Sequence, residues 1–150
     1  MPRVQREANV TWEGNVARGS GEISGVTGAF ENLPYSLAAR VEKPDGKTSP
    51  EELLAAAHAA CYAMSLAGEL AGAGSAPDHL DVRAVVTLDQ VEDGSHRIVG
   101  SELLARARVT GIDGAALQEA AEAASKGCPF SALIEASAKV TVNAQLEGGS

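Results

Sequence analysis

The sequence has few aromatic residues and few cysteines. Aromatic residues make up 3% of its 150 residues, whereas Gly occurs 16 times, so small side chains that let backbones approach closely must help to close the core. The two cysteines, Cys61 and Cys128, do not form a C-x-x-C pair. With three scattered His residues they leave no zinc site of standard spacing, and a permanent disulfide is rare in a reducing cytosol. The two thiols are therefore either inert core residues or a redox pair.

Positive charge is also scarce. The chain has 12 Lys and Arg against 20 Asp and Glu, a net charge of −8, which argues against nucleic acid and anionic membranes as main partners. The uncharged stretch at residues 53–68 is weighted to Ala and interrupted by His58, whereas a membrane span needs roughly 20 strongly apolar residues. Residues 1–7 lack the apolar segment of a secretory signal. We therefore expect a cytoplasmic protein, with residues 1–150 forming a single folded domain.

Residues 49–68 carry the signals of one long helix, which the Gly- and Pro-containing residues 72–77 end. Ser49 suits the N-cap, and a proline follows at the first helical position, where its missing N–H costs nothing. Glu51 and Glu52 lie in the first turn, where the helix dipole favours negative charge. Glu52, three residues after the cap, completes a capping box.

The body of this helix is apolar nearly all round. Between residues 53 and 68 only His58, Tyr62 and Ser65 are polar, so the helix should be buried on most sides. A single chain with few large side chains supplies little cover for such a helix. The pattern therefore predicts a homodimer.

Alternating patterns predict strands on both sides of the helix. Residues 8–41 are expected to form a three-stranded antiparallel unit, in which residues 35–41 are the third strand. Residues 82–88 alternate as a half-buried strand. The returning strand at residues 98–109 changes phase, which indicates a β-bulge near Gly100.

The last part of the chain contains a second helix and a strand. The helix is predicted at residues 114–126, capped by Asp113 and ended by Gly127, with Cys128 directly after it. The strand, residues 140–146, alternates strictly. The predicted order is β-β-β-α-β-β-α-β, an α+β fold in which antiparallel sheets pack around two helices. One cysteine thus lies inside the first helix and the other at the end of the second.

The cysteines acquire chemistry only with suitable neighbours. An isolated Cys61 on an Ala-rich helix is typical of a small core residue, and a reactive thiol needs a nearby cation that lowers its pKa. Arg18, in a Gly-rich turn, and Arg40, at the end of a strand, are the candidate cations, although each could equally be a solvated surface residue. His58 lies one turn before Cys61 and is either its base or a structural residue. If the two thiols work together, Cys61 attacks and Cys128, beside a flexible glycine, resolves.

Glu51 cannot contact Cys61 directly. Ten helical residues separate the two, a distance of about 15 Å at roughly 1.5 Å per residue. The carboxylate therefore acts through an intermediate arginine, serves a site on a partner chain, or is simply a helix N-terminal acid.

Short blocks of sequence follow one another in a fixed order along nearly the whole chain. They are W-E-G from Trp12, R-G-x-G from Arg18, P-Y from Pro34 with Arg40 after it, S-P-E-E-L from Ser49 running into A-A-H-A-A-C at Cys61, and C-P-x-S from Cys128. The helix block and the C-P-x-S block are specific, whereas W-x-G or R-G-x-G alone would be weak. With this set the sequence resembles the OsmC/Ohr family of thiol peroxidases, and its OsmC branch most closely.

The resemblance implies an OsmC-like fold assembled as an intertwined homodimer, with a site at each interface. It implies reduction of organic hydroperoxides, with hydrogen peroxide a poorer substrate, in defence against oxidative and osmotic stress. Cys61 would be the peroxidatic cysteine and Cys128 the resolving one, while Glu51 would hold an arginine by a bidentate contact. Arg40 ranks first for that arginine because it follows the P-Y block, and Arg18 is the alternative.

The chemistry that this resemblance implies needs no metal, flavin or haem cofactor. An arginine favours the Cys61 thiolate, which attacks the peroxide oxygen distal to the organic group, so that an alcohol leaves and a sulfenic acid forms. The sulfenic acid condenses with Cys128 to a disulfide. An external dithiol, a lipoylated protein in the Ohr branch, reduces that disulfide. The expected walls of an apolar substrate pocket are Leu33, Tyr35, Met64 and Phe130.

Two other functions fit the same residues. One is a non-enzymatic dimeric module that binds an apolar ligand, or a redox sensor that uses the same cysteine pair; slow stoichiometric oxidation without turnover would favour it. The other is a Cys–His hydrolase built on His58 and Cys61, for which no third orienting group is identifiable.

Overall fold

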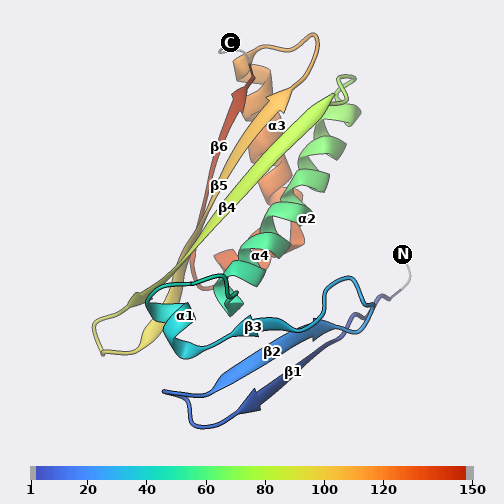
Figure 1. Cartoon of the computed structure of the whole chain (residues 1–150). Coiled ribbons are helices and arrows are strands. Elements are labelled where there is room, and N and C mark those ends of the chain that lie inside the picture. The colour runs from blue at the N-terminus through green and yellow to red at the C-terminus, as the bar shows by residue number, and fades with distance from the viewer. Residues whose placement is uncertain (1–2, 148–150) are drawn as a thin grey trace. The chain divides into compact units, whose positions relative to one another are not determined.

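The computed structural model describes residues 3–147, and the chain divides into two compact units, Met1–Leu53 and Leu54–Ser150 (Figure 1). The observed order of elements is β-β-β-α-α-β-β-α-α-β. The predicted α+β class and the order of its main elements are confirmed. Two short helices, α1 (Leu37–Val41) and α4 (Pro129–Glu135), are additional to the prediction.

The first unit contains a three-stranded antiparallel sheet in the order β1-β2-β3. Its strands are β1 (Ala8–Glu13), β2 (Ser20–Gly25) and β3 (Leu33–Tyr35). A Cβ added to Gly21 of β2 would come within 2.5 Å of the Thr11 carbonyl oxygen and of Cε1 of Tyr35. The missing side chain thus makes room for the ring of Tyr35, which packs against Trp12 with the ring centroids 5.5 Å apart.

The prediction that residues 35–41 form a strand is wrong beyond Tyr35. The chain turns at Ser36 and continues as helix α1. The Ser36 hydroxyl accepts a hydrogen bond from the Ala39 N–H at 3.1 Å, so it acts as an N-cap, and the Leu-Ala-Ala-Arg segment that follows consists of good helix formers. Arg40 therefore lies in the last turn of a helix rather than at the end of a strand.

The second unit packs helices against a three-stranded sheet, β4-β5-β6 (Figure 1). Its elements, besides α4, are most of α2 (Pro50–Gly72), then β4 (His79–Gln90), β5 (His96–Arg108), α3 (Gly114–Gly127) and β6 (Lys139–Leu146). The core is one cluster in which Leu103 of β5, Leu117 of α3 and Tyr62 of α2 are fully buried. Several of its other members are Ala, as the scarcity of aromatic residues requires.

The expectation of purely antiparallel sheets is wrong for β6, which pairs parallel with β5. The two helices α3 and α4 lie between these strands in the chain and carry it back to the start of β5. A connection of that length allows a parallel return, whereas a short hairpin would have forced an antiparallel one.

The predicted β-bulge is confirmed beside Gly100. Strand β4 pairs antiparallel with β5, and the register shifts where Thr87 faces Gly100 while Leu88 faces Ile98, which leaves Val99 as the extra residue. One extra residue reverses the inward and outward positions along a strand. The shift therefore explains why the apolar residues of β5 change from even to odd numbers.

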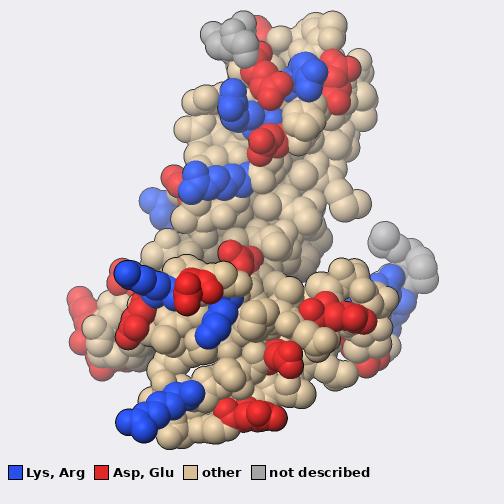
Figure 2. All heavy atoms as spheres, viewed as in Figure 1, with Lys and Arg blue, Asp and Glu red and all other residues tan. Residues whose placement is uncertain are grey.

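Within the second unit, helix α2 buries one face. His58, Tyr62, Leu66 and Leu70 are its buried residues, spaced three or four apart, whereas Met64 is 78% exposed. In Figure 2 the surface over α2 is largely uncharged. By length and composition alone α2 is a helix that could cross a membrane. Its buried His58 and Tyr62, however, form hydrogen bonds to neighbouring elements, as in a core helix.

Candidate functional site

The second unit brings the two cysteines together. Cys61 lies in the middle of α2 and is partly exposed, while Cys128 lies between α3 and α4 and is fully buried. Both are free thiols, and Cys61 packs against the buried core cluster that contains Cys128. Two cysteines from distant parts of the sequence thus lie in one core.

The surroundings of Cys61 favour the protonated form of its thiol. Burial is the main reason why its pKa is raised above the ordinary value, and the hydrogen bond with Cys128 raises it further. A hydrogen bond from the backbone N–H of Phe130 opposes these effects, but no positive charge contributes to the balance. Because the thiolate is the nucleophile, activation of Cys61 needs a cation beyond the neighbours that set its pKa among the described residues.

Cys128 occupies the junction of two helices. It ends α3 and is also the residue before α4, with Pro129 at the first position of α4. Its N–H donates to the Ser125 carbonyl at 3.2 Å, and its own carbonyl accepts from the Ala132 N–H at 3.1 Å. The sequence suggests a freer backbone after Gly127, whereas the structure shows a residue held on both sides.

His58 does not pair with Cys61. Its two ring nitrogens contact hydroxyl groups: Nδ1 lies 2.7 Å from Ser101 Oγ and Nε2 lies 2.8 Å from Ser131 Oγ. Burial lowers the pKa of His58, with a smaller opposing effect of Glu135. This favours the neutral ring, which gives one hydrogen bond and accepts the other. Of the two readings of His58, the structure favours the structural one, and the Cys–His hydrolase loses its base.

Sequence reasoning missed the serines that hold this ring. Ser101 lies on β5 and Ser131 on α4, and both are buried. A usable signal was present: a histidine within an uncharged helix needs two polar partners, and Ser131 is the final residue of the C-P-x-S block.

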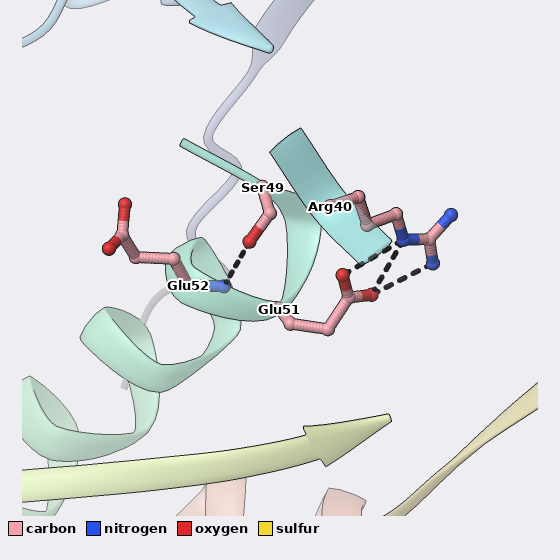
Figure 3. Close-up of polar contacts among 4 residues, drawn as sticks. All are labelled: Arg40, Ser49, Glu51 and Glu52. Atoms are coloured by element: carbon pink, nitrogen blue, oxygen red, sulfur yellow. Dashed lines mark hydrogen bonds and ion pairs between the residues drawn. The ribbon is translucent and has the colours of Figure 1, made fainter. Parts of the chain in front are cut away.

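The first unit holds an arginine–glutamate pair. Arg40 Nε donates to Glu51 Oε1 at 2.8 Å and to Oε2 at 3.1 Å, while Arg40 Nη2 donates to Oε2 at 2.8 Å (Figure 3). The hydrogen bond with Glu51 raises the pKa of Arg40. This is the bidentate contact expected between Glu51 and an arginine, and it fixes the plane of the guanidinium group.

The first turn of α2 aims Glu51 at α1. Ser49 Oγ accepts from the Glu52 N–H at 3.1 Å (Figure 3), so the predicted N-cap is confirmed. The predicted capping box is not completed, because the Glu52 carboxylate accepts from the Thr48 hydroxyl at 2.7 Å. The two neighbouring carboxylates therefore have different partners, and only Glu51 binds an arginine.

Arg18 lies apart from this pair in the chain, in the turn between β1 and β2. It is exposed, and its backbone N–H donates to Asn15 Oδ1 at 2.9 Å. Within residues 3–147, no ion pair involves its guanidinium group. Of the two predicted candidates, Arg40 is thus the one that Glu51 orients.

An apolar pocket of about 250 Å³ adjoins Arg40 in the first unit. Its main walls are Trp12, Val16, Tyr35, Leu37 and Pro50, with Arg40 as the charged residue. Of the four predicted wall residues only Tyr35 lines it. Leu33, which lies on β3 of the same unit, does not line it. Met64 and Phe130 belong to the second unit, so their role as pocket walls stays a prediction.

The part of the chain that the structure describes contains no group of three or more His, Cys, Asp or Glu side chains arranged to hold a metal ion. The chemical groups that the structure does present are two thiols in the second unit, and an oriented guanidinium group beside an apolar pocket in the first. Together these features define a two-cysteine protein of α+β fold.

Comparison with known proteins identifies the family. The model of the family described as OsmC-like protein matches residues 43–143. Peroxiredoxin OsmC of Escherichia coli K12 is 36% identical over 144 residues, which are 96% of this chain and 98% of that protein. The chain therefore belongs to the OsmC family, and the resemblance found in the sequence is confirmed.

Solved structures agree with this assignment. The organic hydroperoxide resistance protein OhrB of Bacillus subtilis matches with a TM-score of 0.70 and 28% identity, covering 94% of this chain and 98% of its own. An OsmC-like protein of unknown function from Vibrio cholerae matches with a TM-score of 0.75 and 16% identity, covering 95% and 99%. The second likeness concerns the fold alone.

Proposed function

We propose that the chain is a thiol peroxidase that reduces organic hydroperoxides to alcohols, with hydrogen peroxide a poorer substrate. The observation that carries the proposal is the placement of the free thiols of Cys61 and Cys128 in one core cluster. It occurs in a chain that is 36% identical to a protein named peroxiredoxin OsmC. The name of the Bacillus subtilis structure, an organic hydroperoxide resistance protein, supports the same class of substrate.

The reaction proceeds in two steps. The Cys61 thiolate attacks the distal oxygen of the peroxide, the O–O bond breaks, and the organic oxygen leaves as an alcohol after taking up a proton. Cys61 is then a sulfenic acid. The thiol of Cys128 attacks the Cys61 sulfur, an S–S bond replaces the S–O bond, and water leaves. Partial exposure suits Cys61 to meet the peroxide, and burial suits Cys128 to the second step.

Arg40 is the proposed activating cation. Cys61 receives no positive charge from its own unit, whereas the guanidinium group of Arg40 is already oriented by Glu51. A cation close to a thiol lowers its pKa and increases the thiolate fraction. Arg18 stays the second candidate, without an orienting partner among residues 3–147.

The proposed assembly is an intertwined homodimer in which the two units of each chain act as one OsmC-like domain. The uncovered apolar side of α2 supports dimerisation, because apolar surface of this kind gains free energy from burial against a partner. The match of relatives over 96% of the chain supports a single functional domain.

The pocket beside Arg40 is the proposed place of the organic group. Its aromatic and aliphatic walls would hold an alkyl or aryl chain. Hydrogen peroxide has no such group and gains nothing from these walls. A dithiol, with a lipoylated protein as the candidate, would reduce the disulfide in the cytosol as part of defence against oxidative and osmotic stress.

The test is peroxide consumption by the purified protein. With excess dithiol, the wild type is expected to consume cumene hydroperoxide or tert-butyl hydroperoxide continuously, and Cys61→Ser to consume none beyond the background. Without dithiol, Cys128→Ser is expected to react once and to accumulate a sulfenic acid that dimedone traps. Full steady activity of Cys61→Ser would overturn the assignment.

A redox sensor with the same thiol pair is the second candidate. The raised pKa of Cys61 favours it, because a protonated thiol reacts slowly with peroxide. Oxidation that stops after one equivalent with every dithiol tried would select the sensor over the peroxidase.

A further inference from the structure

His58 is a buried titratable residue that the proposed reaction does not use. It is fully buried on α2, and a polar ring in the core costs free energy unless both nitrogens find partners. Its partners come from two different elements, Ser101 of β5 and Ser131 of α4. The ring therefore connects the helix that carries Cys61 to the sheet and to the segment that follows Cys128.

Ser131 is the point at which this network reaches the second thiol. It is fully buried, and its hydroxyl also accepts from the Ser125 hydroxyl of α3 at 3.3 Å. Ser131 stands three residues after Cys128, in the first turn of α4. A contact that fixes Ser131 consequently fixes the turn that begins at Cys128.

The same turn lies in one core with Cys61. Both Cys61 and Phe130 pack against the cluster that contains Cys128, and the Phe130 N–H and the Cys128 thiol are the neighbours that influence the pKa of Cys61. His58 and Cys61 lie three residues apart on α2, so they share one face of that helix. Helices α2 and α4 are thus joined at two neighbouring points, one through His58 and Ser131 and one through Cys61 and Phe130.

We infer that His58 is a positioning residue for disulfide formation: through Ser131 it holds Cys128 and the Phe130 N–H beside the Cys61 sulfur. The inference rests on the proposed peroxidase function. In the step concerned, the Cys128 sulfur attacks the sulfur of the Cys61 sulfenic acid. The S–S bond forms, the S–O bond breaks, and the hydroxyl group leaves with the proton of Cys128 as water.

The burial of Cys128 is the reason that positioning matters. A buried thiol has no room to search for its partner, so the rate of this step depends on a preset alignment of the two sulfur atoms. A neutral His58 suits the role because it gives one hydrogen bond and accepts another, and burial favours that neutral form.

The variant that tests the inference is Ser131→Ala, which removes one hydroxyl group and leaves both cysteines. The reduced protein is mixed with a single equivalent of cumene hydroperoxide without dithiol, and dimedone-trapped sulfenic acid and disulfide are followed with time. The oxidation of Cys61 is expected to keep its rate. The conversion of sulfenic acid to disulfide is expected to slow about tenfold.

Ser65→Ala is the matched control. It removes a serine hydroxyl from the same helix, one that donates to the Ala124 carbonyl of α3 at 2.7 Å, and it leaves the His58 contacts intact. Its disulfide is expected to form at the wild-type rate. Equal slowing in Ser65→Ala and Ser131→Ala would overturn the inference, because general loosening of the core would then explain both.

Ser101→Ala provides a second test that does not depend on the folding of Ser131→Ala. It keeps the contact between His58 and Ser131 but frees the ring from β5, and the same step is expected to slow. Disulfide formation at the wild-type rate in the serine variants that fold overturns the inference. Failure of the wild type to react with cumene hydroperoxide would contradict the proposed function rather than this inference. The rates of disulfide formation in the wild type and the serine variants are then compared with concentrated hydrogen peroxide, which oxidises thiols directly.

Discussion

The ionisation of Cys61 is opposed by the surroundings that its own unit gives it. Burial and the Cys128 thiol hold its pKa above the ordinary value, so reactivity at neutral pH requires a cation brought to the sulfur. Arg40 and Arg18 are the two predicted candidates, and among residues 3–147 only Arg40 of the two has a carboxylate that orients it. Local sequence allows both arginines to be listed as candidates. The choice between them requires the contact with Glu51, which depends on the path of the chain between residues 40 and 51.

Arg40→Gln tests this dependence through the pH profile of Cys61 alkylation. Because a cation lowers the pKa of a thiol, its removal should move the midpoint of iodoacetamide alkylation upward by about one pH unit. The rate at pH 7 should fall accordingly. The measurement uses a Cys128→Ser background, so that only Cys61 reacts.

Arg18→Gln in the same background is the control for Arg40→Gln, and its profile is expected to stay unchanged. An upward shift of the alkylation midpoint in Arg18→Gln, together with an unchanged midpoint in Arg40→Gln, would assign the activating role to Arg18.

Among the elements, short helix α1 and the first turn of α2 determine where Arg40 and Glu51 point. The N-cap at Ser49 was predictable because the signal lies within four residues. Helix α1 was not, because five residues carry too little periodicity to distinguish a turn of helix from a strand. The parallel pairing of β6 with β5 could not be predicted from the sequence either. The direction of β6 depends on how α3 and α4 return the chain to the sheet. The contacts of His58 with Ser101 and Ser131 join residues far apart in sequence, and no local pattern encodes such pairs.

Glu51→Gln examines the link between the two elements. The amide keeps the size of the side chain but removes the charge that makes the Arg40 contact strong, so peroxide oxidation of Cys61 should slow about tenfold or more. Stability should change by about 1 kcal/mol or less, since Arg40 is 38% exposed and a partly exposed ion pair contributes little. Stopped-flow oxidation and thermal unfolding measure the two effects.

Glu52→Gln supplies the control from the neighbouring position. Its carboxylate binds Thr48 rather than an arginine, so the oxidation rate should match that of the wild type. Equal rates in Glu51→Gln and Glu52→Gln would contradict a role for the Arg40 contact.

At the scale of the whole molecule, the feature that points to a partner is the apolar side of α2 that stays exposed to solvent. The composition of the helix predicts burial on most sides, and one chain buries a single face. The small side chains of the core fill the interior of the second unit. They are too short to cover the opposite side of α2 as well. The sequence thus indicates the need for a partner, while the arrangement of two chains is beyond what a pattern in one chain can specify.

The wild type is expected to be a homodimer at micromolar concentration by light scattering. Met64→Glu places a charge on the exposed apolar side of α2 and should shift the mass toward that of a monomer, because a buried unpaired charge is costly. Ser137→Glu, in the exposed turn after α4, adds the same charge elsewhere and should leave the dimer intact. A monomeric wild type would contradict the proposed assembly.

The oriented arginine and the two thiols lie in different units. This placement matters while the chain is being synthesised. A chain still leaving the ribosome carries a Cys61 thiol whose pKa its own unit holds above the ordinary value. Such a thiol is a poorer target for irreversible overoxidation and for mixed disulfides with small thiols. If Arg40 is the activating cation, we expect the newly made thiol to stay unreactive until that arginine reaches it.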